Sequence, residues 1–135
     1  MKQRLITIAF ARLPYSELLP NNLRRTHWAV RSSVSATARK EAYYLGKEIP
    51  YKAPIEHCEI EEVFTVPTRK TRDIESLLGA AKPWIDGLVD AGIIVDDSCW
   101  HVHRLSGSVK HKKGVEKTDI RIKELAPPGL GIGGD

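Results

Sequence analysis

The stretch from Arg72 to Trp100 places the strongest constraint on this chain, because it combines a helical pattern with unbalanced charge. Residues 73–97 hold six acidic side chains and one basic side chain, Lys82. The acids at the two ends of the stretch are Asp73, Glu75, Asp96 and Asp97. Packing so much negative charge is costly unless a cation neutralises it, so in a basic protein the pattern indicates a metal site.

The interior of this stretch predicts a helix over residues 74–90 that ends at Gly92, a favourable C-cap glycine. Pro83 interrupts the pattern, so we expect a kink or a break near residues 80–82. A short buried strand is expected at residues 93–95. The apolar stripe of the helix is Leu77, Leu78, Ala81, Ile85, Leu88 and Val89.

Alternating and helical patterns elsewhere predict the remaining elements. Strands are expected at residues 4–10 and 55–66, with Cys58 in the core and Glu59 and Glu61 on the solvent face. A helix is expected at residues 32–47. Residues 100–110 and 115–125 read as two antiparallel strands joined by a turn, with a core role for Trp100.

The expected fold is therefore a small α+β domain spanning residues 1–125, with a mixed or antiparallel sheet of four to five strands and two main helices. The tail at residues 126–135 is rich in proline and glycine, so we expect it to be disordered. A length of 135 residues fits one domain.

Composition narrows the function classes. No apolar run reaches membrane-spanning length, and the first ten residues are typical of a strand and not of a signal peptide. Cys58 and Cys99 form no zinc-ligand spacing, so we expect reduced thiols in a cytoplasmic protein. His101, His103 and His111 are expected to decorate a strand and its turn.

The net charge of +4 is unevenly distributed. Residues 18–40 and 98–115 contain no acid, while residues 69–72 hold three basic side chains directly before the acidic stretch. Such segregation favours a polyanionic partner, with chance clustering on a soluble surface as the alternative. The candidate DNA-binding residues are Arg24, Arg25, Arg31, Arg69, Lys70, Arg72, Lys110, Lys112 and Lys113.

The acidic side chains suit phosphodiester hydrolysis, which needs charge stabilisation and an activated water. Mg²⁺ supplies both, and it prefers carboxylate oxygens and water as ligands. Asp73, Glu75 and Asp97 are the candidate ligands, with Asp96 beside them. Lys82 lies seven residues after Glu75, roughly on the same helical face, where it would bind the scissile phosphate or assist the leaving oxygen.

Each of these residues also has a purely structural interpretation. Asp73 is a good helix N-cap, and Glu75 would favour the same helix dipole. The pair Asp96 and Asp97 would form an ordinary turn. Lys82 would pair with Asp86 four residues later. Because the predicted helix is roughly 25 Å long, Asp97 rejoins Asp73 only if the chain runs straight back, if the break at Pro83 shortens the path, or if a second subunit supplies part of the site.

The sequence RDIESLLGAAKPWIDGLVDAGIIVDDS resembles the signature of the RusA-like Holliday junction resolvases of phages and prophages. That signature is an Asp-x-Asp-Asn motif, a downstream lysine, a hydrophobic helix end and an Asp-Asp pair. Pro20, Asn21 and Asn22 resemble the proline-asparagine loop of that family. Over residues 5–125 the order of elements is similar. The corresponding residues here are Asp73, Glu75, Ser76, Lys82, Asp86, Gly87, Leu88, Asp96, Asp97 and Ser98.

The resemblance implies an interlinked homodimeric endonuclease of a bacterial or phage-infected cytoplasm, which nicks four-way DNA junctions symmetrically with Mg²⁺ or Mn²⁺ and without a small-molecule cofactor. It implies metal-ligand roles for Asp73, Glu75 and Asp97 and the essential basic role for Lys82, and it places Asp96 as a neighbour. Trp28 or Trp100 is a candidate wedge at a branch point.

Three departures from the signature keep alternatives open. Glu75 replaces aspartate, Ser76 replaces asparagine, and an ungapped comparison puts Gly79 where the lysine belongs. Lys82 lies three residues further, nearly one helical turn, and is the preferred assignment. A non-catalytic protein that binds branched DNA and a nuclease that prefers forks, flaps or RNA are the alternative functions.

Overall fold

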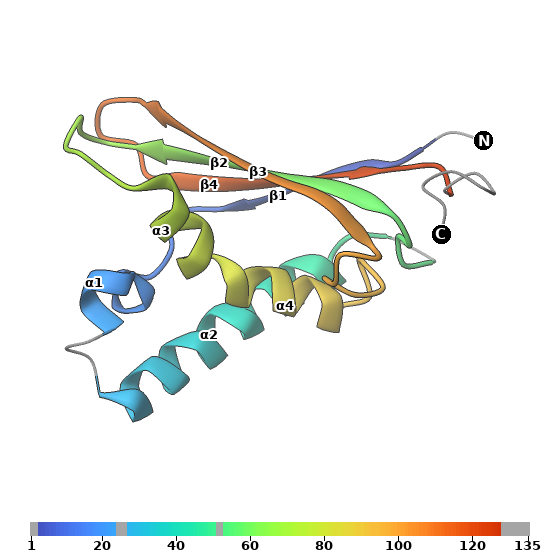
Figure 1. Cartoon of the computed structure of the whole chain (residues 1–135), viewed down its shortest axis with the longest axis horizontal. Helices are drawn as coiled ribbons and strands as arrows, with labels where there is room; N and C mark the ends of the chain where they lie inside the picture. Colours follow the sequence, from blue (N-terminus) through green and yellow to red (C-terminus); the bar gives the residue numbers. More distant parts are fainter. Residues whose placement is uncertain (1–2, 24–26, 51–52, 128–135) are drawn as a thin grey trace.

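The computed structural model describes residues 3–23, 27–50 and 53–127, which form a sheet covered on one face by helices (Figure 1). The sheet has four strands in the order β1-β4-β2-β3. This confirms the predicted α+β class, with a mixed sheet and two main helical segments. Among the described residues no helix is long and apolar enough to cross a membrane.

The elements follow one another along the chain in a simple order. The strands are β1 (Leu5–Phe10), β2 (Cys58–Val66), β3 (Val102–His111) and β4 (Lys117–Glu124). The helices are η1 (Ser16–Leu18), α1 (Pro20–Leu23), α2 (Trp28–Lys47), α3 (Ile74–Ala80) and α4 (Lys82–Asp90). Four of the five predicted strands and the predicted helices are therefore confirmed, and α2 begins four residues earlier than residue 32.

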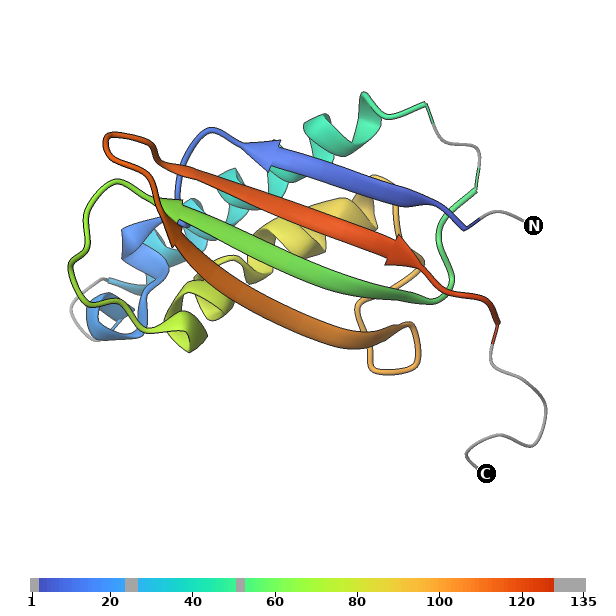
Figure 2. The ribbon, with the colours of Figure 1, turned by 90° about the horizontal axis from the view of Figure 1, so that it is seen from above.

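The order of the strands differs from the expected pairing of the last two. β2 lies between β3 and β4, parallel to β3 and antiparallel to β4, as Figure 2 shows from above. β3 and β4 run in opposite directions, but β2 separates them, so they are not a hairpin. The predicted strand at residues 93–95 is reduced to one bridge, between Ile94 and Ile55.

The helix expected at residues 74–90 is broken where Pro83 requires it. α3 ends at Ala80, and α4 begins at Lys82 with the proline in its first turn, where no backbone N–H is needed. α4 ends before Gly92, whose φ of 80° is the left-handed conformation of a C-cap glycine. Both predictions are confirmed.

The core lies between the sheet and the pair α2 and α4. Trp84 is 1% exposed, and its ring stacks on Phe10 with the centroids 4.1 Å apart. Cys58 is buried, as expected. The core role expected for Trp100 is wrong, because that side chain is 77% exposed. Ile93 and Ile94 are buried in the core, whereas Trp100 lies in the turn that precedes β3.

Candidate active site and nucleic-acid-binding surface

The first group of candidate residues lies at the start of α3. Asp73 is the N-cap: one carboxylate oxygen accepts the backbone N–H of Glu75 at 3.1 Å, and the other accepts the hydroxyl of Ser76 at 3.2 Å. Glu75 is exposed in the first helical turn. The structural interpretation of Asp73 is therefore present in the geometry, and its carboxylate is held in a fixed orientation.

The second group is centred on Lys82, the first residue of α4. Its ammonium donates to a carboxylate oxygen of Asp86 at 2.5 Å and to one of Asp97. The contact with Asp86 is the ordinary pairing of residues four apart on a helix. The contact with Asp97 joins residues fifteen apart and depends on the chain turning back after α4. Asp96 accepts the backbone N–H of Asp97 at 2.9 Å, so a local hydrogen bond joins the two residues of this pair.

The surroundings of Lys82 and Asp97 shift the pKa values of both groups. Partial burial would by itself lower the pKa of Lys82, but the hydrogen bonds and charges of Asp86 and Asp97 outweigh it and raise that pKa. The hydrogen bond from Lys82 lowers the pKa of Asp97. The group therefore pairs one ammonium with two carboxylates.

The structure brings Lys82 and Asp97 together but does not bring Asp73 and Glu75 to them. Within the described residues, no three His, Cys, Asp or Glu side chains lie close enough together to hold a metal ion. Asp86 is a neighbour of Lys82 and Asp97 that the candidate ligands did not include. The spacing of four residues between Lys82 and Asp86 is the sequence feature that could have identified Asp86 as a member of this group.

Two hollows in the surface adjoin these groups, one at each end of α3. A hollow of about 670 Å³ is lined by Asp73 and Ser76 together with Arg12, Lys70 and Arg72. A second hollow of about 540 Å³ is lined by Gly79, Lys82, Asp86 and Arg39. The capped carboxylate of Asp73 thus shares its hollow with three cations, while Lys82 faces the other one.

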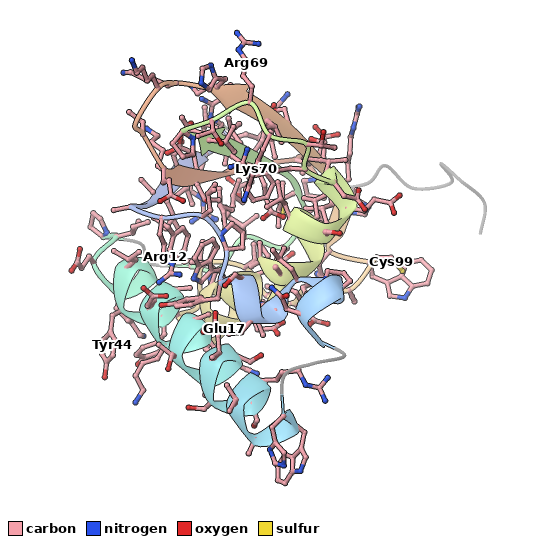
Figure 3. All side chains as sticks on the ribbon, turned by 90° about the vertical axis from the view of Figure 1, so that its left-hand side faces the viewer. Arg12, Glu17, Tyr44, Arg69, Lys70 and Cys99 are labelled. Carbon is pink, nitrogen blue, oxygen red and sulfur yellow. The ribbon has the colours of Figure 1, made fainter. Side chains whose placement is uncertain are left out.

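Several candidate basic residues gather at one end of the sheet. The loop after β2 and the turn after β3 lie side by side there, because the backbone N–H of Lys112 donates to the carbonyl of Val66 at 3.0 Å. Figure 3 faces this end and shows Arg69 projecting from it, with Lys70 nearby. The basic end is formed by Arg69, Lys70, Arg72, Lys110, Lys112 and Lys113, which the sequence separates into two clusters.

Arg72 and the candidate cations outside the basic end have different surroundings. The guanidinium of Arg72 donates to the carbonyls of Thr68 at 2.9 Å and Lys70 at 3.2 Å, so Arg72 shapes the loop after β2. Arg31 lies on α2, and its buried Nε has no hydrogen-bond partner among the described residues. Arg24 and Arg25 lie outside the described residues.

The donor chemistry of the Lys82 group fits a hard divalent cation. Asp86 and Asp97 already present two carboxylates to one positive charge. Mg²⁺ is commonly bound by one or two carboxylates together with waters and substrate phosphates, so it does not need a closed protein cage. The residues present therefore fit Mg²⁺ in ligand type, although Asp73, Glu75 and Asp97 do not converge on one point.

No family model matches this chain, but a comparison with known proteins shows similarity to a bacterial protein. The chain is 31% identical over 121 residues to a protein of Xylella fastidiosa (strain Temecula1 / ATCC 700964) named "Uncharacterized protein". The matched region covers 86% of this chain and 77% of that protein. The chain therefore belongs to the same family as that protein, whose printed name states no activity.

Proposed function

We propose that this protein is a metal-dependent endonuclease that hydrolyses phosphodiester bonds in branched DNA, with the four-way junction as its substrate and a homodimer as its active form. The observation that carries the proposal is the pairing of Lys82 with Asp97. A surface helix explains Lys82 beside Asp86, but it gives no reason for the acidic pair to return to the same ammonium. This pairing supports a site assembled from the two halves of the resolvase-like signature.

The chemistry of the proposed reaction assigns a role to each group. Because its pKa is raised, Lys82 stays protonated at neutral pH and serves as a cation for the scissile phosphate instead of a base. Asp97, Asp73 and Glu75 are the proposed carboxylate ligands, with Asp96 beside Asp97. Because they do not converge among the described residues of one chain, the proposed homodimer would have to bring the start of α3 from one subunit to Asp97 of the other. Mg²⁺ or Mn²⁺, when bound, supplies charge stabilisation and a water of lowered pKa.

DNA is held in this proposal by the basic end, mainly through phosphates. The hollow lined by Arg12, Lys70 and Arg72 joins that end to the start of α3. A phosphate backbone that lies along the loop after β2 would therefore pass over the Asp73 carboxylate. Resolution of a junction needs two cuts, and a two-fold homodimer provides two related sites.

Cleavage of a labelled mobile four-way junction tests the proposal directly. We expect paired symmetric nicks with Mg²⁺ or Mn²⁺ and none with EDTA. Asp97→Asn should lower the rate by roughly 100-fold or more, the scale for losing one electrostatic group at a reacting centre, while junction binding persists. Asp90→Asn is the matched control, because Asp90 pairs with Arg39 and not with Lys82. Equal activity of the Asp97 variant and the control would refute the assignment.

A second function is favoured by one observation. Asp73 uses both carboxylate oxygens within its own helix, as a purely structural cap does. A non-catalytic protein that binds branched DNA would need no more than this. Salt-sensitive junction binding without nicks under either divalent ion would select that function, and cleavage of forks or flaps in preference to junctions would reassign the substrate.

A further inference from the structure

Three histidines meet at the end of the sheet opposite the basic end. His57 directly precedes β2, His101 directly precedes β3, and His103 is the second residue of β3. The backbone fixes this region: the carbonyl of His101 accepts the N–H of Cys58 at 2.9 Å, and the carbonyl of His57 accepts the N–H of Leu125 at 2.8 Å. The three rings are therefore held at the starts of two adjacent parallel strands.

An irregularity in the strand pairing directs His103 toward its neighbour. Cys58 pairs with Val102 and Glu59 with Arg104, so His103 is an extra residue on β3 with no partner on β2. Such bulges re-aim a side chain and are frequent beside functional sites. Here the bulge accompanies a direct contact, because Nδ1 of His57 and Nε2 of His103 are 2.9 Å apart.

That distance has two chemical explanations. Either the two ring nitrogens share one proton, or both lone pairs point at one metal ion. Bonds from a metal to imidazole nitrogen are about 2.0–2.1 Å long, so two such nitrogens lie about 2.9 Å apart at a right angle and about 3.4 Å apart at the tetrahedral angle. The observed separation matches two adjacent positions at a right angle around one ion, and the two nitrogens would have to move about 0.5 Å further apart to reach the tetrahedral angle that Zn²⁺ prefers.

The ring of His101 lies beside the pair formed by His57 and His103. Nδ1 of His101 lies 2.8 Å from the carbonyl oxygen of Glu56. Because a carbonyl only accepts, Nδ1 donates a proton to it and the ring is fixed by this hydrogen bond. The ring of His101 also stacks on that of His57, with the centroids 5.9 Å apart. This arrangement restricts the orientation of His57 and places another imidazole beside the pair.

We propose that His57 and His103 bind a divalent transition metal, Zn²⁺ or Cu²⁺, as two protein ligands whose coordination is completed by water. Imidazole nitrogen favours these ions, whereas Mg²⁺ favours the carboxylates near α3 and α4. The ion would replace the proton shared by the two rings and join the start of β2 to the bulge of β3. The site shares no ligand with the Lys82 group and does not depend on the proposed nuclease activity.

Titration calorimetry with ZnCl₂ on the full chain tests the site. We expect one ion per chain, and His57→Ala and His103→Ala should each weaken binding at least tenfold. His111→Ala is the matched control, since His111 ends the same strand and lies beside the basic end. Cys99→Ser should also leave binding unchanged. With Cu²⁺, the nitrogen hyperfine pattern in electron paramagnetic resonance should be lost in the first two variants and kept in the controls.

A second measurement uses the unaltered protein, so it does not depend on the folding of a variant. In ¹⁵N-resolved imidazole spectra, Zn²⁺ should shift Nδ1 of His57 and Nε2 of His103 while the signals of His111 stay in place. Absence of zinc binding, unchanged binding in His57→Ala and His103→Ala, or loss of binding in His111→Ala or Cys99→Ser would overturn the proposal. Mg²⁺-dependent nicking should persist in all four variants, so the two proposals fail separately.

Discussion

Glu62 places an ionisable carboxyl group within the apolar face of β2. It is 1% exposed, and its strand partners are Ile120 on β4 and Gly107 on β3. One of its carboxyl oxygens is buried without a hydrogen-bond partner among the described residues. Burial disfavours the charged form and raises the pKa of Glu62 to about 8. The protein therefore carries this side chain protonated at neutral pH.

The raised pKa of Glu62 predicts a loss of stability as the pH rises. The group ionises near its ordinary value of 4.5 in the unfolded chain and near 8 in the folded one. Between these values the folded state holds a proton that the unfolded state has released, so the free energy of unfolding falls across this interval. At pH 7 the free energy of unfolding is therefore about 3 kcal/mol lower than at a pH below both pKa values. Glu62→Gln should remove this difference, which urea unfolding at pH 5 and pH 7.5 will measure.

Glu61→Gln is the control for that measurement. Glu61 directly precedes Glu62 on β2, but its side chain is exposed and pairs with Arg121 at 3.2 Å. Exposed ion pairs contribute only about 0–1 kcal/mol, so this variant should keep the pH dependence of the unaltered protein. If both variants show the same pH dependence, Glu62 is not the group responsible.

Sequence patterns at the residue scale find only local partners. They predicted the Asp73 cap and the pairing of Lys82 with Asp86, because both depend on neighbours within one helical turn. They did not single out Glu62, because three other glutamates lie close to it in the sequence. The alternation of residues along β2 nevertheless puts Glu62 on the core face of the strand. The convergence of Lys82 and Asp97 depends on the path of the chain after α4, which no local pattern determines.

At the scale of elements, the contact between α2 and α4 depends on small residues. A Cβ atom added at Gly87 would lie 2.1 Å from the carbonyl oxygen of Arg39 and 2.7 Å from Cβ of Ala42. Neither the backbone nor Ala42 is able to yield much, so Gly87→Ala must push the helices apart. We expect a destabilisation of about 3 kcal/mol, the upper part of the overpacking range. Thermal and urea unfolding will measure it.

Gly79→Ala, near the end of α3, is the matched control. An added Cβ at Gly79 meets nothing within 4 Å. The substitution therefore removes backbone entropy from the unfolded chain without a clash, and it should stabilise α3 by about 0.5–1 kcal/mol. Two glycine-to-alanine changes of opposite sign would confirm that helix contact, and not helix propensity, decides the effect at Gly87. Destabilisation by both would contradict it.

The existence of the strands and helices was predictable from the sequence, but the order of the strands in the sheet was not. Periodicity located all four strands and the break at Pro83, because pattern and proline act on the chain locally. The place of β2 between β3 and β4 was missed, since the last two strands are adjacent in sequence and joined by a short segment. Trp100 was misplaced because its large apolar side chain suggested burial, whereas it lies in an exposed turn just before β3.

At the scale of the whole molecule, the two ends of the sheet differ in chemistry. The basic end combines cations from the loop after β2 and the turn after β3, while the opposite end holds three histidines. Because β2 and β3 are parallel, the loop that leaves one and the turn that leaves the other emerge together. Topology thus turns two sequence clusters into one surface, which is a stronger reason to expect a polyanion than the net charge alone.

Salt dependence of DNA binding tests whether that surface holds the phosphates. Replacing Lys110, Lys112 and Lys113 by alanine should lower the slope of log K against log salt by about 0.9 for each phosphate that is no longer neutralised, hence by about 2–3 in total. The control replaces three exposed lysines elsewhere, Lys40, Lys47 and Lys123, and changes the net charge by the same amount. Fluorescence anisotropy with a labelled four-way junction between 50 and 200 mM salt, roughly the range over which such interactions are screened, gives both slopes. A long-range effect of net charge would change the two slopes equally, whereas direct phosphate binding at the basic end changes only the first.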